Sequence, residues 1–112
     1  MSQAFVWFHN GSEKPADAAA FYEKLFGWKP ADGPPGMTML AREAGPFAAV
    51  MPKKGDARGW VPYVQVDDVA AATKRAVQLG AELLEDQTRG PAGTYSVVRD
   101  PGGATVALWQ KA

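Results

Sequence analysis

The sequence predicts an α+β domain in which a strand–helix–strand unit occurs twice. The clearest copy spans Trp60 to Leu84 and opens with a run rich in β-forming residues. Asp67 and Asp68 follow, and their carboxylates suit the N-cap and first turn of a helix. Apolar residues then recur at helical spacing, and Gly80 stands where a left-handed residue ends a helix. A new extended segment begins after it.

Two helices are predicted, each with an apolar stripe. In the earlier one, Pro15 suits the first turn because its missing N–H is not needed there, and Gly27 ends the helix. The stripe of this helix consists of Ala18, Phe21, Tyr22 and Leu25. The stripe of the later helix consists of Val69, Ala72, Ala76, Val77 and Leu79.

Short strands and turns fill the rest of the chain. Beside the run 60–66, the predicted strands are Phe5–His9, Met37–Arg42, Phe47–Met51, Thr94–Arg99 and Ala104–Trp109. The segments 10–14, 31–36 and 85–93 are polar or rich in Gly and Pro, so they are predicted to be loops. Asp100-Pro101-Gly102-Gly103 predicts a type II turn with positive φ at its third residue, Gly102.

The two halves of the chain match in element order. Gly27 follows Trp7 by 20 residues, and Gly80 follows Val61 by 19. This repetition indicates an internal duplication within a single domain, 1–112, with modules at about 1–54 and 58–112. Each half alone is too small to bury its sheet, so we expect the halves to share a core.

Composition excludes several classes of protein. The chain has 112 residues and no cysteine, which excludes a disulfide framework and a thiolate site. Twelve basic residues balance twelve acidic ones, so a nucleic-acid surface has no electrostatic support. The sequence contains no apolar run as long as a membrane span and no signal-peptide pattern, so we expect a soluble cytoplasmic protein without membrane contact.

The order of short motifs along the whole chain resembles that of the vicinal oxygen chelate superfamily. This superfamily includes glyoxalase I, bleomycin-resistance proteins and extradiol dioxygenases, and the glyoxalase-like subgroup is the most similar. The resemblance implies two βαβββ modules whose mixed sheet curls into an open cup with the helices outside, and it implies a homodimer. The motifs are Ala20-Phe21-Tyr22, Leu25-Phe26-Gly27-Trp28, Trp60-Val61-Pro62-Tyr63, Val66-Asp67-Asp68-Val69, Leu79-Gly80-Ala81 and Asp100-Pro101-Gly102-Gly103-Ala104.

The resemblance also implies where a metal would bind. Enzymes of this superfamily hold a divalent metal with four His, Gln or Glu side chains on the cup strands. Carried onto this chain, the four positions fall on Trp7, Ala49, Val61 and Ala107. Indole, methyl and isopropyl groups donate nothing to a hard cation, so we expect no metal and no cofactor.

Strand alternation predicts which side chains line the cup. Val6, Phe8, Val64, Val66, Val106 and Leu108 are assigned to the helix side. The opposite, aromatic and apolar face is typical of a small-molecule pocket. The candidate ligand-binding residues on it are Phe5, Trp7, His9, Phe47, Met51, Tyr63, Gln65, Thr105 and Trp109.

Three functions remain open, the third being a structural or partner-binding module. The first is a protein without metal ligands that binds a small, partly aromatic molecule in its cup, as bleomycin-resistance proteins do. The alternative is an enzyme of the glyoxalase or dioxygenase type (a lyase, isomerase or dioxygenase). It would use His9 or Tyr63 as an acid–base group, or metal donors at other positions. Each candidate also has a structural interpretation: Trp7 and Trp109 as hydrophobic core, and His9 as a hydrogen-bonded strand-end residue.

Overall fold

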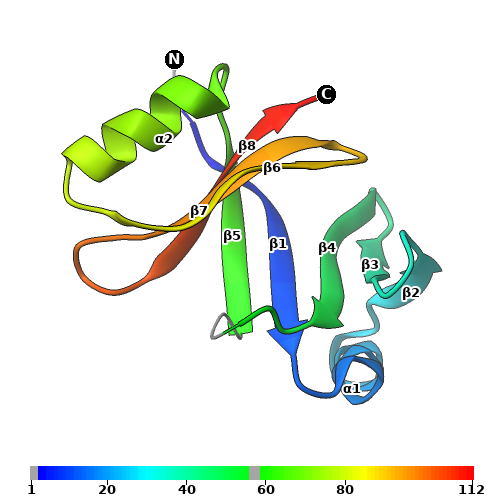
Figure 1. Ribbon diagram of the computed structural model, residues 1–112. Helices are drawn as coiled ribbons and strands as arrows, with labels where there is room; N and C mark the ends of the chain where they lie inside the picture. Colours follow the sequence, from blue (N-terminus) through cyan, green and yellow to red (C-terminus); the bar gives the residue numbers. More distant parts are fainter. Residues whose placement is uncertain (1–2, 56–58) are drawn as a thin grey trace. The chain divides into compact units, whose positions relative to one another are not determined.

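The computed structural model describes residues 3–55 and 59–112, which form two compact units (Figure 1). The N-terminal module is Trp7–Val61. The C-terminal module is Pro62–Ala112 together with residues 3–6. The predicted α+β class is confirmed, since each module combines one helix with a mixed sheet. Neither helix of the described chain has the length and apolar character needed to cross a membrane.

The N-terminal module has the strand order β2-β3-β4-β1. Its β1 runs parallel to β4, whereas β2, β3 and β4 pair in antiparallel fashion. Helix α1 contacts β2, β3 and β4. The elements are β1 (Phe5–Ser12, in this module from Trp7 on), α1 (Pro15–Phe26), β2 (Lys29–Asp32), β3 (Thr38–Arg42) and β4 (Gly45–Pro52).

The C-terminal module repeats this plan with the order β5-β8-β7-β6 and a parallel pair between β5 and β8. Helix α2 contacts β6, β7 and β8. Both β5 and α2 begin 54 residues after β1 and α1, so the element order recurs at a constant spacing. The elements are β5 (Gly59–Gln65, in this module from Pro62 on), α2 (Val69–Gln78), β6 (Glu82–Gly90), β7 (Gly93–Arg99) and β8 (Thr105–Lys111).

Helix α1 packs through small residues. Ala19 joins Leu40, Ala48 and Val50 in a buried cluster, with Ala18, Tyr22 and Phe8 packed against it. The predicted stripe is therefore wrong in part, because Phe21 and Leu25 are 56% and 57% exposed. Because Ala19 faces the sheet, helical periodicity places Phe21 and Leu25 on the opposite side of the helix.

Helix α2 begins as predicted and buries part of the predicted stripe, since Val69 is buried and Ala72 and Ala76 are half-buried. The Asp68 carboxylate accepts a hydrogen bond from the Ala71 N–H at 3.0 Å, which is a side-chain N-cap. The buried residues are Val69 and Thr73, whereas Val77 and Leu79, predicted on the apolar stripe, are 46% and 62% exposed. A polar residue can be buried there because the Thr73 hydroxyl lies 2.6 Å from the Val69 carbonyl oxygen and 2.7 Å from Ser96 Oγ.

Three segments predicted as loops lie partly in strands. β1 continues to Ser12, β2 takes in Ala31 and Asp32, and β6 continues to Gly90. In each case a neighbouring strand supplies the backbone pairing: β4 for β1, β3 for β2 and β7 for β6. Polar composition therefore misled the prediction, because ladder hydrogen bonds use backbone groups whatever the side chains are.

The turn after β7 is of a different type from the one predicted. Positive φ falls on Gly103 (98°), whereas Gly102 is not among the residues with positive φ. The Gly103 N–H donates to the Asp100 carbonyl at 2.9 Å, and the Asp100 carboxylate accepts from the N–H groups of Gly102 and Ala104. Asp at the first position, Pro at the second and Gly at the fourth are the preferences of a type I turn.

We expect Gly93→Ala to destabilise the protein by about 3 kcal/mol. Gly93 has φ 145°, and a Cβ there would lie 2.8 Å from Trp109 Nε1 and 2.9 Å from the Ala112 nitrogen. Denaturant unfolding measures the loss. Gly90→Ala is the control, since its Cβ would meet nothing closer than 3.8 Å. Equal stabilities of the two variants would contradict this account.

Candidate functional site

The sheet face of the C-terminal module that lies away from α2 collects several predicted site residues. Ser96 bonds to Thr73 of α2, so its strand neighbours Tyr95 and Val97 face the other side. Register partners share a face, and the rows here are Gln65–Trp109–Tyr95, Tyr63–Ala107–Val97 and Thr105–Arg99. Tyr63, Gln65, Thr105 and Trp109 therefore lie on one face, as strand alternation predicts. Their role in ligand binding stays a prediction.

A polar cluster forms on this same face. Glu85 Oε2 accepts hydrogen bonds from the Thr88 hydroxyl at 2.6 Å and from the Tyr95 hydroxyl at 3.0 Å. The rings of Tyr63 and Tyr95 lie 5.9 Å apart. Tyr63 is only 6% exposed, and burial, reinforced by Tyr95 and Glu85, raises the pKa of its phenol. Tyr63 is therefore a neutral hydroxyl at physiological pH.

A bulge in β6 builds this cluster. Glu85 pairs with Val97 and Thr88 with Tyr95, so residues 86 and 87 together stand opposite Ser96. Gln87 takes φ 45° there, and its N–H donates to the buried Ser96 hydroxyl at 3.0 Å. Residues three apart in a regular strand point to opposite faces, but the bulge places the Glu85 and Thr88 side chains together.

The sequence interpretation missed Glu85, Thr88 and Tyr95. The first two fall in the segment 85–93 that was predicted as a loop. Tyr95 lies in a correctly predicted strand, and alternation from Val97 would have placed it on the same face as Trp109. The bulge itself carries no strong sequence signal, since its positive-φ residue is a glutamine rather than a glycine.

The N-terminal module contributes Trp7 and His9 on the face of its sheet away from α1. Phe8 packs on the α1 side, so its two strand neighbours point the other way, as predicted. Their rings meet edge to face at 6.2 Å, and His9 pairs in register with the fully buried Ala49. Burial lowers the pKa of His9 to about 4, so its imidazole is neutral at pH 7. Met51, opposite Gly11, is half-buried.

Phe47 does not share the face that was predicted for it. Leu40 pairs with Ala48 and Ala41 with Pro46, which leaves Phe47 as the extra residue of a bulge. Its ring packs against the α1-side cluster and meets Trp28 edge to face at 4.8 Å. The Arg42 guanidinium lies 5.1 Å from the ring centre. A second predicted residue, Phe5, is 57% exposed.

The side chains at the implied metal positions do not fit a metal. His9 pairs with Ala49 and Tyr63 pairs with Ala107, which makes the two alanines equivalent in the two modules. Both are fully buried methyl groups, and Trp7 and Val61 likewise offer no donor to a hard cation. Among residues 3–55 and 59–112, no group of three or more His, Cys, Asp or Glu side chains could hold a metal ion.

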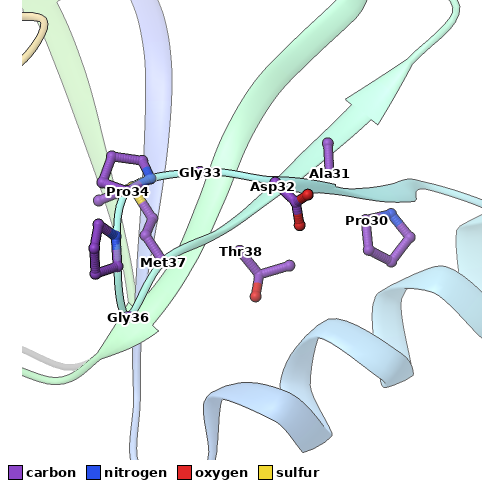
Figure 2. A pocket seen from close by; sticks show the side chains of 9 residues that line it. Pro30, Ala31, Asp32, Gly33, Pro34, Gly36, Met37 and Thr38 are labelled. Atoms are coloured by element: carbon purple, nitrogen blue, oxygen red, sulfur yellow. The ribbon is translucent and has the colours of Figure 1, made fainter.

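A hollow of about 450 Å³ lies at the hairpin between β2 and β3 (Figure 2). It is lined by residues 30–38, in which prolines and glycines predominate and Asp32 carries the charge. Asp32 and Thr38 are register partners across the hairpin. None of the predicted ligand-binding residues lines this hollow, and its lining has no acid–base pair or aromatic ring.

Two βαβββ modules, each with a parallel pair between its first and last strands, define a protein of the vicinal oxygen chelate superfamily. The chain belongs to the family of glyoxalase-like domains, whose model matches residues 7–109. It is 36% identical, over 93% of its length, to "Putative glyoxylase CFP32" of Mycobacterium tuberculosis. It is 31% identical, over 95% of its length, to the anthracycline biosynthesis protein DnrV of Streptomyces peucetius. The chain spans 44% and 46% of these two relatives.

A solved structure shows the same fold. It is a glyoxalase/bleomycin resistance protein/dioxygenase superfamily member from Vibrio splendidus 12B01, with a TM-score of 0.68 and 12% sequence identity. The match covers 99% of this chain and 100% of that one. The similarity confirms the fold at an identity too low to carry function.

We expect His9 to make the protein less stable in acid. Its pKa is about 4 in the folded state and 6.5 as a free group, so between these values the unfolded chain binds more protons. Its contribution is full well above pH 6.5, and about 3 kcal/mol is lost as the pH falls to 4.

Denaturant unfolding of the wild type and of His9→Gln at pH 7 and pH 4.5 measures this difference. The variant lacks the imidazole, so its stability should fall less over this interval, with the carboxylates common to both proteins cancelling. An identical loss in both proteins would show that His9 does not titrate differently on folding.

Proposed function

We propose that this chain binds a small, partly aromatic molecule without the help of a metal ion. The supporting observation is the face of the C-terminal module away from α2, where Tyr63, Tyr95 and Trp109 gather beside the polar Glu85 and Gln65. Aromatic walls with a few placed polar groups are typical of small-molecule sites. Trp109 and Tyr95 are half-buried, which leaves part of each ring to contact a ligand.

The pKa values of the two acid–base candidates favour binding over catalysis. A general acid or base works best when its pKa lies near the operating pH. Burial instead lowers the pKa of His9 to about 4 and raises that of Tyr63 above its usual value of 10.0. Both groups are then neutral near pH 7, where they donate or accept hydrogen bonds but exchange protons poorly with a substrate.

The relatives support a role in small-molecule chemistry. The names of CFP32 and DnrV refer to a glyoxylase and to anthracycline biosynthesis, respectively. The name of CFP32 supports the alternative function, an enzyme of the glyoxalase or dioxygenase type. Such an enzyme would need metal donors other than the side chains at Trp7, Ala49, Val61 and Ala107, which have none. A cytoplasmic location is part of the same proposal.

We expect binding of small aromatic probes to survive metal removal. Ligand-observed NMR with a set of such probes, before and after dialysis against a chelator, should give the same bound set and the same melting temperature. Trp109→Ala should abolish binding because it removes the largest ring of the face. Trp60→Ala is a control aromatic deletion outside this face. A stoichiometric metal in the purified protein, or binding lost on chelation, would favour the metalloenzyme.

We further propose that the chain forms a homodimer. Helix α1 of the N-terminal module exposes Phe21, Leu25 and Phe26, each more than half accessible. A group of exposed large apolar side chains on a small protein marks an interaction surface. A second copy of the chain is the partner we expect to cover it.

Leu25→Glu should convert the dimer into a monomer, because a charge would be buried at the interface. Light scattering over a range of protein concentrations measures the mass. Lys24→Glu on the same helix is the matched control and should remain dimeric. A monomeric wild type at high concentration would contradict the proposal.

A further inference from the structure

The sheet face of the C-terminal module away from α2 carries a carboxylate, that of Glu85, beside its aromatic rings. Glu85 receives two hydroxyl donors on one oxygen, Oε2, from Thr88 and Tyr95. These contacts fix the direction of the carboxylate, and a neutral hydroxyl leaves its negative charge in place. Glu85 also lies close enough to Tyr63 to contribute to the raised pKa of that phenol. The Glu85 charge therefore acts electrostatically on the aromatic side chains of this face.

The basic residues of this face stand at its two ends. Arg99 pairs with Glu82 at 3.1 Å and lies opposite Thr105, at the far end of the sheet from Trp109. Lys111 is exposed at the end of β8. Glu85 pairs with Val97, and Thr88 with Tyr95, so the carboxylate sits between these ends. A ligand lying over the aromatic rows thus meets a negative charge.

We propose that the ligand carries a protonated amine. The ammonium group would bind the Glu85 carboxylate by a charge-assisted hydrogen bond, with the rings of Tyr95 and Tyr63 at its sides and the apolar part of the ligand against Trp109. A carboxylate attracts a cation directly, and the negative face of an aromatic ring adds to that attraction. An anionic ligand would be repelled by the same group. This inference rests on the proposed binding function and names its ligand class.

Three probes with nearly the same skeleton test the charge preference. They are 2-phenylethylamine, a cation at pH 7; 2-phenylethanol, which is neutral; and 3-phenylpropionate, an anion. Titrations followed by protein NMR should show the amine binding about tenfold more tightly than the alcohol, as one charge-assisted hydrogen bond provides. The anion should bind more weakly than either. Equal affinity for amine and alcohol would overturn this inference and leave the proposed binding function intact.

The substitution Glu85→Gln removes the charge while its amide oxygen can still accept from Tyr95 and Thr88. It should abolish the preference for the amine over the alcohol. Glu23→Gln, the same change at an exposed position of α1, is the matched control and should keep the wild-type preference. An amine preference that survives Glu85→Gln would refute the role of this residue.

A second measurement needs no variant and covers the case in which Glu85→Gln fails to fold. Added salt screens the attraction between charges, so rising ionic strength should weaken binding of the amine to the wild-type protein but not of the alcohol. A salt-independent amine affinity would count against the inference. Failure of all three probes to bind the wild type would instead count against the proposed function itself.

Discussion

Each module depends on the parallel pairing of its first strand with its last. A parallel pair cannot be closed by a tight turn and needs a crossover connection, which in each module consists of a helix and two further strands. This constraint accounts for the repeated order of elements and for the helix that covers one face of each sheet. It also fixes the register that sets His9 beside Ala49 and Tyr63 beside Ala107. The candidate site inherits its geometry from that register.

Local signals in the sequence were sufficient to predict the helices and most of the strands. Pro15, Gly27 and Asp68 mark helix ends through backbone chemistry that operates without any tertiary contact. The failures are of another kind. The polar run in β6 pairs as a strand with β7, and Thr73 is buried where its hydroxyl meets that of Ser96, whereas Val77 is exposed. Such outcomes depend on neighbours that a linear pattern does not specify.

The face of each site residue could be predicted from the sequence only where its strand is regular. Alternation put Tyr63, Gln65, Thr105 and Trp109 on a common face because β5 and β8 are regular there. It failed for Phe47, where one extra residue in β4 reverses the orientation of the ring. It also could not reveal Glu85, whose place depends on an irregular strand. Bulges are thus the points at which sequence periodicity stops reporting side-chain direction.

The irregularity in β6 has an evolutionary implication. Because two residues there occupy the space of one, losing either Asp86 or Gln87 would restore a regular strand in which Glu85 and Thr88 stand two positions apart and still share a face. The remaining strands could keep their partners. A single-codon deletion would then preserve both the scaffold and the charge presented to a ligand. The length of this strand can therefore change by one residue in evolution without removing the carboxylate from the site.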